Sequence, residues 1–308
     1  MRRAMSASRL SLRTPATAAA LALALTAAVW LPVRIRAQAP ARGQNVVPVY
    51  EGFWRNADGT FDLLFGYYNR NWEEVIDVPV GAGNTLDPGG PDRGQPTHFF
   101  PRRNQFVFKV RVPANFDKNE VVWTLTSHGE SEKAYGSLRP AYAVDETVMM
   151  ANFGAGGQTG FTPDMMGNQP PKLKLEGEKR RTVKVGEPVT LDAVATDDGK
   201  PKPRPMSAFL VGQSHFVPNS ATGLRLSWFV YRGPGTVSFD PPQTKVWQDH
   251  RDGGNSPWSA GWSTPPVPPG NKWTVRATFS DPGTYVLRAL AHDGGLIDYD
   301  DVTVTVTR

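Results

Sequence analysis

The chain of 308 residues contains no cysteine. Without thiols it forms no disulfide, no thiolate nucleophile and no cysteine-ligated metal centre. An exported chain without disulfides fits a bacterial cell envelope better than a small disulfide-stapled eukaryotic domain. Its stability then comes from hydrophobic cores, and the length is sufficient for two domains.

Histidine is scarce, and the common catalytic motifs are absent. The five histidines are scattered without the H-E-x-x-H spacing of a zinc site: His98, His128, His215, His250 and His292. There is no G-x-S-x-G elbow, no P-loop and no dinucleotide-binding G-x-G-x-x-G after a strand. The sequence predicts no catalytic residue, no metal site and no cofactor. A hydrolase assembled from residues far apart in the chain stays open as an alternative.

Aspartates gather in one place, at the C-terminal end. They are Asp293, Asp298, Asp300 and Asp301, with Asp197 and Asp198 in an earlier turn. Oxygen ligands of this kind suit Ca²⁺, but the spacing is not that of an EF-hand loop. Because aspartate also favours turns, we expect turn chemistry here, with a calcium site as the alternative.

Excess positive charge is missing from most of the chain, although the formal net charge is +5. Residues 1–39 hold six arginines and no acidic residue, which leaves 28 basic and 29 acidic residues in the remainder. A body with such balanced charge lacks the clustered basic face that nucleic acid requires. We therefore expect no nucleic-acid partner.

The N-terminal residues 1–39 have the pattern of a secretory signal peptide. An arginine-bearing start precedes a short apolar run at residues 18–31, and small residues at Ala37 and Ala39 suit cleavage. The apolar run is shorter than a membrane-spanning helix. Arg34, Arg36 and Pro40 lie around the cleavage position, so an uncleaved membrane anchor is the alternative.

Many short alternating segments separated by glycine and proline predict an all-β fold of two β-sandwich domains in tandem. The first domain is expected at residues 46–145, where Phe106, Phe108 and Val110 alternate with Gln105, Val107, Lys109 and Arg111. A Met/Gly-rich linker is expected at residues 146–171. The second domain is expected at residues 172–308.

Residues 172–308 carry several motifs in order. GEPVTLDAVATDDGKPKP is followed by LRLSWFVYRGPGTVSFDPP, whose strand has Trp228 at its centre, and then by ATFSDPGTYVLRALAHDGGLIDYDDVTVTV. This order resembles that of bacterial PKD-type Ig-like domains. The resemblance implies a sandwich closed by a C-terminal hairpin, and a binding or spacer role. The first domain resembles no family in this way.

Two insertions depart from the PKD-type pattern, at residues 204–222 and 243–272. The second, which we call the tryptophan loop, carries the candidate binding residues Trp247, Trp258 and Trp262. Tryptophan offers a large rigid surface for stacking on sugar rings or anchoring a protein partner. The alternative is that these rings cover a sheet edge or a domain interface.

Together these features predict an exported, non-catalytic binding or structural module of the bacterial cell envelope, in the periplasm or at the cell surface. Its expected partner is a protein or glycan of the envelope, and membrane contact is expected only through an uncleaved N-terminal segment. Two alternatives remain. One is an accessory subunit of a membrane complex, and the other is a secreted carbohydrate-active hydrolase with an Ig-like accessory domain.

Overall fold

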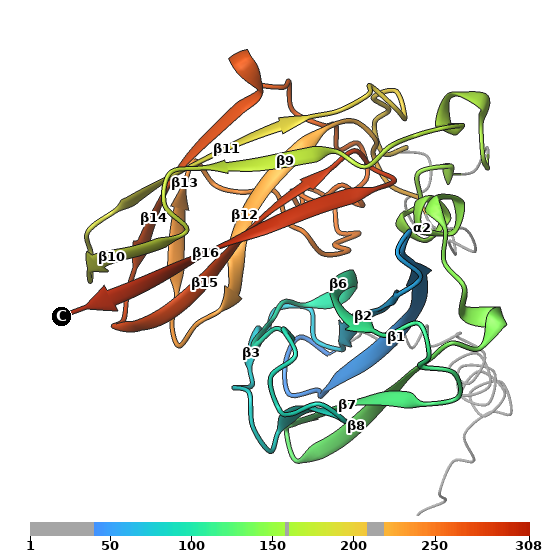
Figure 1. The fold of residues 1–308 in the computed structure, drawn as a ribbon. Coiled ribbons are helices and arrows are strands. Elements are labelled where there is room, and N and C mark those ends of the chain that lie inside the picture. Colours follow the sequence, from blue (N-terminus) through green and yellow to red (C-terminus); the bar gives the residue numbers. More distant parts are fainter. Residues whose placement is uncertain (1–39, 158–159, 208–218) are drawn as a thin grey trace, which may run out of the picture. The chain divides into compact units, whose positions relative to one another are not determined.

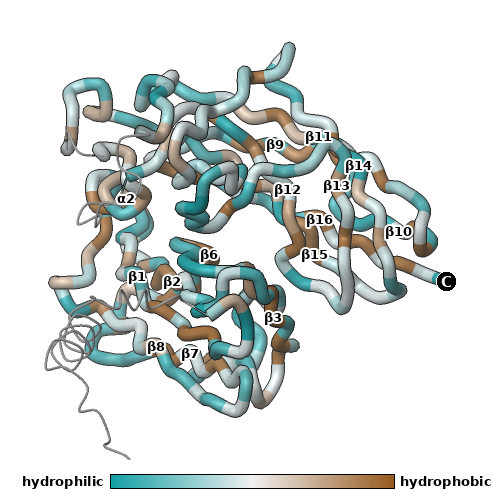
Figure 2. Tube along the Cα trace, turned by 180° about the vertical axis from the view of Figure 1, so that it is seen from behind, coloured by the Kyte–Doolittle hydropathy of each residue, from teal (hydrophilic) through white to brown (hydrophobic). Residues whose placement is uncertain are grey.

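The computed structural model describes residues 40–157, 160–207 and 219–308 (Figure 1). The predicted signal peptide at residues 1–39 and most of the insertion at residues 204–222 lie outside these described residues. The described part is built almost entirely of strands, which confirms the predicted all-β class. In Figure 2 the hydrophobic segments run mainly along the strands, as expected where strands bury one face.

The first sandwich is formed by two three-stranded antiparallel sheets and a short strand pair. One sheet has the order β1-β2-β6 and the other the order β4-β7-β8, while β3 pairs with β5. The strands are β1 (Val46–Arg55), β2 (Phe61–Asn69), β3 (Ile76–Asp77), β4 (Asn84–Asp87), β5 (His98–Phe99), β6 (Arg102–Val112), β7 (Glu120–Ser127) and β8 (Glu130–Ser137).

The core of the first sandwich follows the predicted alternation. Phe108 and Val110 of β6 lie in this core, with the exposed Lys109 between them. Phe106 is buried too, but in a separate cluster with Leu64. Trp123 of β7 is fully buried, and its indole N–H donates to Oδ1 of Asn84 at 2.9 Å. The buried polar atom is thereby satisfied within an otherwise apolar layer.

The second sandwich has two four-stranded sheets, with the orders β10-β16-β15-β12 and β13-β14-β11-β9. Strand β10 runs parallel to β16, and the other pairs are antiparallel. The strands are β9 (Lys172–Glu176), β10 (Arg180–Lys184), β11 (Val189–Thr196), β12 (Arg225–Arg232), β13 (Val237–Asp240), β14 (Lys272–Phe279), β15 (Gly283–His292) and β16 (Ile297–Thr307).

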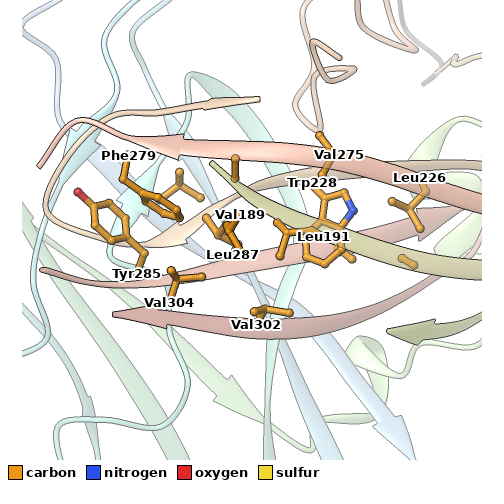
Figure 3. Close-up of a cluster of buried hydrophobic side chains, with 14 of the residues drawn as sticks. Val189, Leu191, Leu226, Trp228, Val275, Phe279, Tyr285, Leu287, Val302 and Val304 are labelled. Atoms are coloured by element: carbon orange, nitrogen blue, oxygen red, sulfur yellow. The ribbon is translucent and has the colours of Figure 1, made fainter. Parts of the chain in front are cut away.

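This strand order is Ig-like. The sheet β13-β14-β11-β9 has the D-E-B-A order of an immunoglobulin domain, and β16-β15-β12 has the G-F-C order. Trp228 of β12 is buried between the sheets, where strand C of an Ig domain places its tryptophan (Figure 3). The hydroxyl of Tyr285, early in β15, donates to the carbonyl of Asp281 at 2.9 Å, which matches the tyrosine corner of that fold.

Residues 146–171, which the sequence predicts to be a linker, contain the helix α2 (Glu146–Phe153). Asp145 caps its start by accepting from the Val148 N–H at 2.8 Å, and Gly154 ends it with a φ of 84°. The buried face of α2, with Met149, Met150 and Phe153, packs against residues of both sandwiches, namely Leu64, Phe106 and Leu296. The described residues belong to a single compact unit, so the boundaries at 145 and 171 stay a prediction.

Arg288 of β15 joins the two sandwiches. This side chain is 5% exposed, and its Nη1 donates to the carbonyl of Val107 in β6 at 2.5 Å. Its Nε and Nη2 donate to the two carboxylate oxygens of Asp301 at 2.8 and 2.9 Å. The guanidinium also lies 3.5 Å from the ring centre of Tyr231 and 4.0 Å from that of Tyr299. The Arg288 side chain thus makes an ion pair, stacks on aromatic rings and donates a hydrogen bond to the other sandwich.

We expect the substitution Arg288→Met to lower the free energy of unfolding by about 3 kcal/mol, because Asp301 loses its partner and the Val107 carbonyl its donor. The control is Arg276→Met, whose ion pair with Asp240 is exposed on both sides. This substitution should lower the free energy of unfolding by less than about 1 kcal/mol. Urea unfolding followed by tryptophan fluorescence measures both, and equal losses would contradict a special role for Arg288.

Candidate binding groove at two sheet edges

A groove of about 780 Å³ lies between the edges of the two sheets of the second sandwich. Strand β12 ends one sheet and β13 ends the other, and both line the groove. Residues 242–247 of the chain form another wall, and the first sandwich contributes residues that include His98 and Phe100. The volume is typical of a ligand-binding cleft.

The backbone of β12 offers hydrogen-bonding groups to this groove. The N–H of Trp228 donates to Oε1 of Gln243 at 3.0 Å and therefore points away from the neighbouring strand β15. Because backbone groups alternate in direction along an antiparallel strand, those of Leu226 and Val230 point the same way. The amide of Gln243 thus occupies the position that a carbonyl of an adjacent strand would take.

The tryptophan loop is held in shape by a buried carboxylate. Asp249 has no exposed surface, and it accepts from Nε and Nη2 of Arg251, both at 2.8 Å, and from Nζ of Lys245 at 2.7 Å. The hydroxyl of Ser259 donates to the backbone carbonyl of Asp249 at 2.7 Å, and the hydroxyl of Ser256 donates to the carbonyl of Trp247 at 2.9 Å. The groove wall is therefore fixed by an internal polar network.

Two opposing effects set the pKa of Asp249. Burial alone raises the pKa of a carboxyl, but the hydrogen bonds and charges of Arg251 and Lys245 outweigh it and hold the pKa at about 2. The carboxylate is therefore ionised in the folded protein at any pH above this value, and its two cationic partners stay attached.

The three candidate tryptophans lie in three different environments. Trp247 is 6% exposed and lines the groove, with Nζ of Lys245 4.8 Å from its ring centre. Trp258 is 4% exposed and packs into the cluster around α2. Trp262 is half-buried against Met206, and its indole N–H donates to Oδ1 of Asn255 at 3.2 Å. A binding role for these residues stays a prediction, and Trp247 is the one that the structure brings to the groove.

The side of the groove contributed by the first sandwich carries aromatic and ionisable groups. Nδ1 of His98 lies 2.7 Å from Oδ1 of Asp77, and the ring of Phe100 lies 5.8 Å from that of Phe229 on β12. The N–H of Thr97 already donates to the carbonyl of Tyr231 at 3.2 Å, so the edge of β12 that another strand could pair with lies before Tyr231. Aromatic walls beside such a strand edge suit an extended chain with alternating apolar side chains.

The C-terminal aspartates are distributed among separate partners. Asp301 pairs with Arg288, and Asp300 pairs with Lys179 at 2.5 Å. Asp298 accepts from the N–H of Leu173 at 2.9 Å, and Asp293 accepts from the N–H of Leu296 at 2.6 Å. Within the described ranges, no group of three or more His, Asp or Glu side chains is placed to hold a metal ion.

Some residues of the groove were not singled out by the sequence. Gln243 and Phe229 were not predicted as binding residues, and only the sheet order shows that β12 is an edge strand. The composition of the tryptophan loop led to Trp247 but did not distinguish it from Trp258, which lies away from the groove.

No protein-family model matches the chain, and no curated protein matches it either. Among solved structures, immunoglobulin domains 1–4 of Sidekick-1 match with 13% identity and a TM-score of 0.23, over 85% of this chain and 48% of that one. Domains 4 and 5 of the S-layer protein SbsC match with 9% identity and a TM-score of 0.23, over 62% of this chain and 66% of that one. The D00-D0 domain of intimin matches with 11% identity and a TM-score of 0.22, over 85% of this chain and 100% of that one.

The chain thus spans about half of the Sidekick-1 structure it matches. Similarities at these TM-scores carry no argument about function, so the Ig-like assignment rests on the strand order, Trp228 and Tyr285. The narrower resemblance to PKD-type domains stays a prediction. Among the residues that the structure describes, none of the helices has the length and apolar character to span a membrane.

We expect Asp249→Asn to lower the free energy of unfolding by about 2 kcal/mol at pH 7, because charge-assisted hydrogen bonds to Arg251 and Lys245 are lost. Because the pKa of Asp249 is lower in the folded protein than in the unfolded chain, its carboxylate stabilises the fold above the unfolded-state pKa near 4. This stabilisation is lost as the pH falls toward 2. The difference from the wild type should therefore shrink between pH 4 and pH 2.

Denaturant unfolding at a series of pH values measures this difference. The control is Asp252→Asn, an exposed neighbour in the same loop, which should change the free energy of unfolding by less than about 0.5 kcal/mol. A difference between Asp249→Asn and the wild type that stays constant from pH 7 to pH 2 would show that the ionised carboxylate is not the source.

Proposed function

We propose that this protein is a non-catalytic binding module of the bacterial cell envelope and that it binds an extended polypeptide segment of a partner protein. The segment lies in the groove and adds to the edge of β12 as a further strand. The observation that carries the proposal is the outward-facing backbone of β12, whose Trp228 N–H is held by a side-chain amide instead of a strand.

Strand addition at such an edge gains affinity from backbone hydrogen bonds and specificity from pockets for alternate side chains. The groove supplies both, since the edge of β12 faces aromatic walls that include Phe229, Phe239 and Trp247. A ligand strand of about five residues would displace the amide of Gln243 and pair with β12.

Export is supported by the amino-acid sequence of residues 1–39 and by the absence of cysteine. An uncleaved N-terminal anchor would make the same module an accessory subunit of a membrane complex, because the groove would then be held at the membrane surface. N-terminal sequencing of the mature protein distinguishes these two forms.

Hydrogen exchange of the backbone amides tests the proposed binding mode. Heptapeptides selected from a random display library on the purified full chain should slow exchange at Trp228 and Val230, since these residues line the groove. Amides of β15 that already pair with β12 should keep their exchange rates. Binding of peptidoglycan fragments without protection of these two amides would favour a glycan ligand and contradict strand addition.

The substitution Thr244→Arg places a long side chain in the groove and should weaken peptide binding at least tenfold. The matched control is Ser238→Arg on β13, which is exposed and does not line the groove. It should bind peptide like the wild type in isothermal calorimetry. Equal affinity of the two variants would place the peptide outside the groove.

A further inference from the structure

Three buried hydrogen-bond donors without a partner line one small cavity beneath the tryptophan loop. The atoms are Nη2 of Arg225, Nε2 of His292 and Nε1 of Trp258, and none has a partner among the described residues. Their side chains are only 4–6% exposed. All three residues line a cavity of about 10 Å³.

Strand pairing explains why these groups meet. Arg225 of β12 lies directly opposite His292 of β15, so the two side chains leave the same face of the sheet as neighbours. That face is opposite to the one carrying Leu226 and Trp228, which enter the sandwich core. Trp258 covers the pair from the tryptophan loop.

The His292 ring acts as a donor at this cavity. Its Nδ1 accepts from the N–H of Gly294 at 2.8 Å, which places the proton of the neutral ring on Nε2. Burial, together with the charge of Arg225, lowers the pKa of His292 well below its usual range, so the ring is neutral at neutral pH.

Arg225 brings a positive charge that its surroundings compensate poorly. Its Nη1 makes only long hydrogen bonds, to the carbonyls of Ala221 at 3.3 Å and Gly223 at 3.4 Å. Burial lowers the pKa of Arg225 to about 10, which still leaves it charged at neutral pH. Lys245 also lines the cavity, but its Nζ is bound to Asp249.

Asp293, which follows His292 in the chain and whose charge acts on Arg225, is a weak counter-charge. Its carboxylate accepts from the N–H groups of Gly295 and Leu296 and from Nδ2 of Asn168. Burial raises the pKa of Asp293 to about 7, so a large fraction of this carboxyl is protonated near neutral pH.

We propose that this cavity is a binding site for a single small inorganic anion, with chloride as the ligand. Three unpaired donors that line one cavity, one of them on a poorly compensated guanidinium, call for an acceptor that carries negative charge. The cavity is too small for phosphate or sulfate, which leaves a monatomic anion. Water fits the donors less well, because its own two hydrogens need acceptors. The site adjoins the proposed peptide groove, with which it shares Lys245 and Val246, but the proposal does not depend on peptide binding there.

Bound chloride should stabilise the fold. In chloride-free buffer at constant ionic strength, with gluconate as the replacement anion, unfolding of the full chain should start at lower denaturant. At a chloride concentration 100-fold above Kd, the ratio of folded to unfolded protein should rise about 100-fold. A folded fraction that does not change between gluconate and chloride would overturn the proposal.

Two variants and a matched control locate the effect. Trp258→Phe removes one donor while keeping most of the packing and should weaken chloride binding at least tenfold, and Arg225→Met should abolish the chloride dependence. Trp273→Phe on β14 should keep the wild-type dependence, because this ring packs against the core of the second sandwich and does not line the cavity. Equal chloride dependence in Trp258→Phe and Trp273→Phe would contradict the site.

If a variant does not fold, wild-type crystals soaked in bromide test whether an anion binds in this cavity. An anomalous peak within hydrogen-bonding reach of Arg225, His292 and Trp258 supports the site. A water molecule without anomalous signal at that position overturns it.

Discussion

The contact made by Arg288 is the constraint on which the rest of the architecture depends. One guanidinium pairs with Asp301, lies between the rings of Tyr231 and Tyr299, and donates to the carbonyl of Val107 in the other sandwich. A buried arginine is tolerated only when its charge is paired, the faces of its guanidinium are covered and its N–H groups have acceptors. Here residues of both sandwiches meet these conditions together. Separating the sandwiches would leave the carbonyl of Val107 without its donor and expose the stacked rings.

The same face of the β12–β15 sheet organises the other functional features. Arg288, Leu290 and His292 alternate along β15 on the side away from the sandwich core. The first sandwich covers the Arg288 end, and the tryptophan loop covers the His292 end. Because neither cover continues the sheet, β12 remains an edge strand, and the groove forms beside it.

The tryptophan loop combines the two roles that its composition leaves open, a binding surface and a cover for other residues. Asp249 and its two cationic partners hold the loop as a wall, and Trp258 seals a cavity beneath it. Only Trp247 reaches the groove among the three candidate indoles. The aromatic surface of Trp258 is used for packing, and in the proposed binding mode the edge of β12 would provide the recognition chemistry through its backbone.

The amino-acid sequence by itself determined the all-β class, the closing hairpin β15–β16 and the core face formed by Tyr285, Leu287 and Ala289, because a period of two places alternate residues on one side of a strand. It could not show that the opposite face is buried as well. Arg288 and His292 appear polar and therefore exposed in a strand pattern, yet both are 5% exposed.

Only the tertiary structure shows that Arg288 and His292 are buried, since the residues that cover this face lie far away in the sequence, in β6 and in the tryptophan loop.

Helix α2 was missed for a related reason. Its eight residues give too short a pattern to stand out, and the cluster that stabilises it comes from both sandwiches. The groove likewise required the sheet order, because local periodicity predicts a strand but does not show whether it lies at an edge.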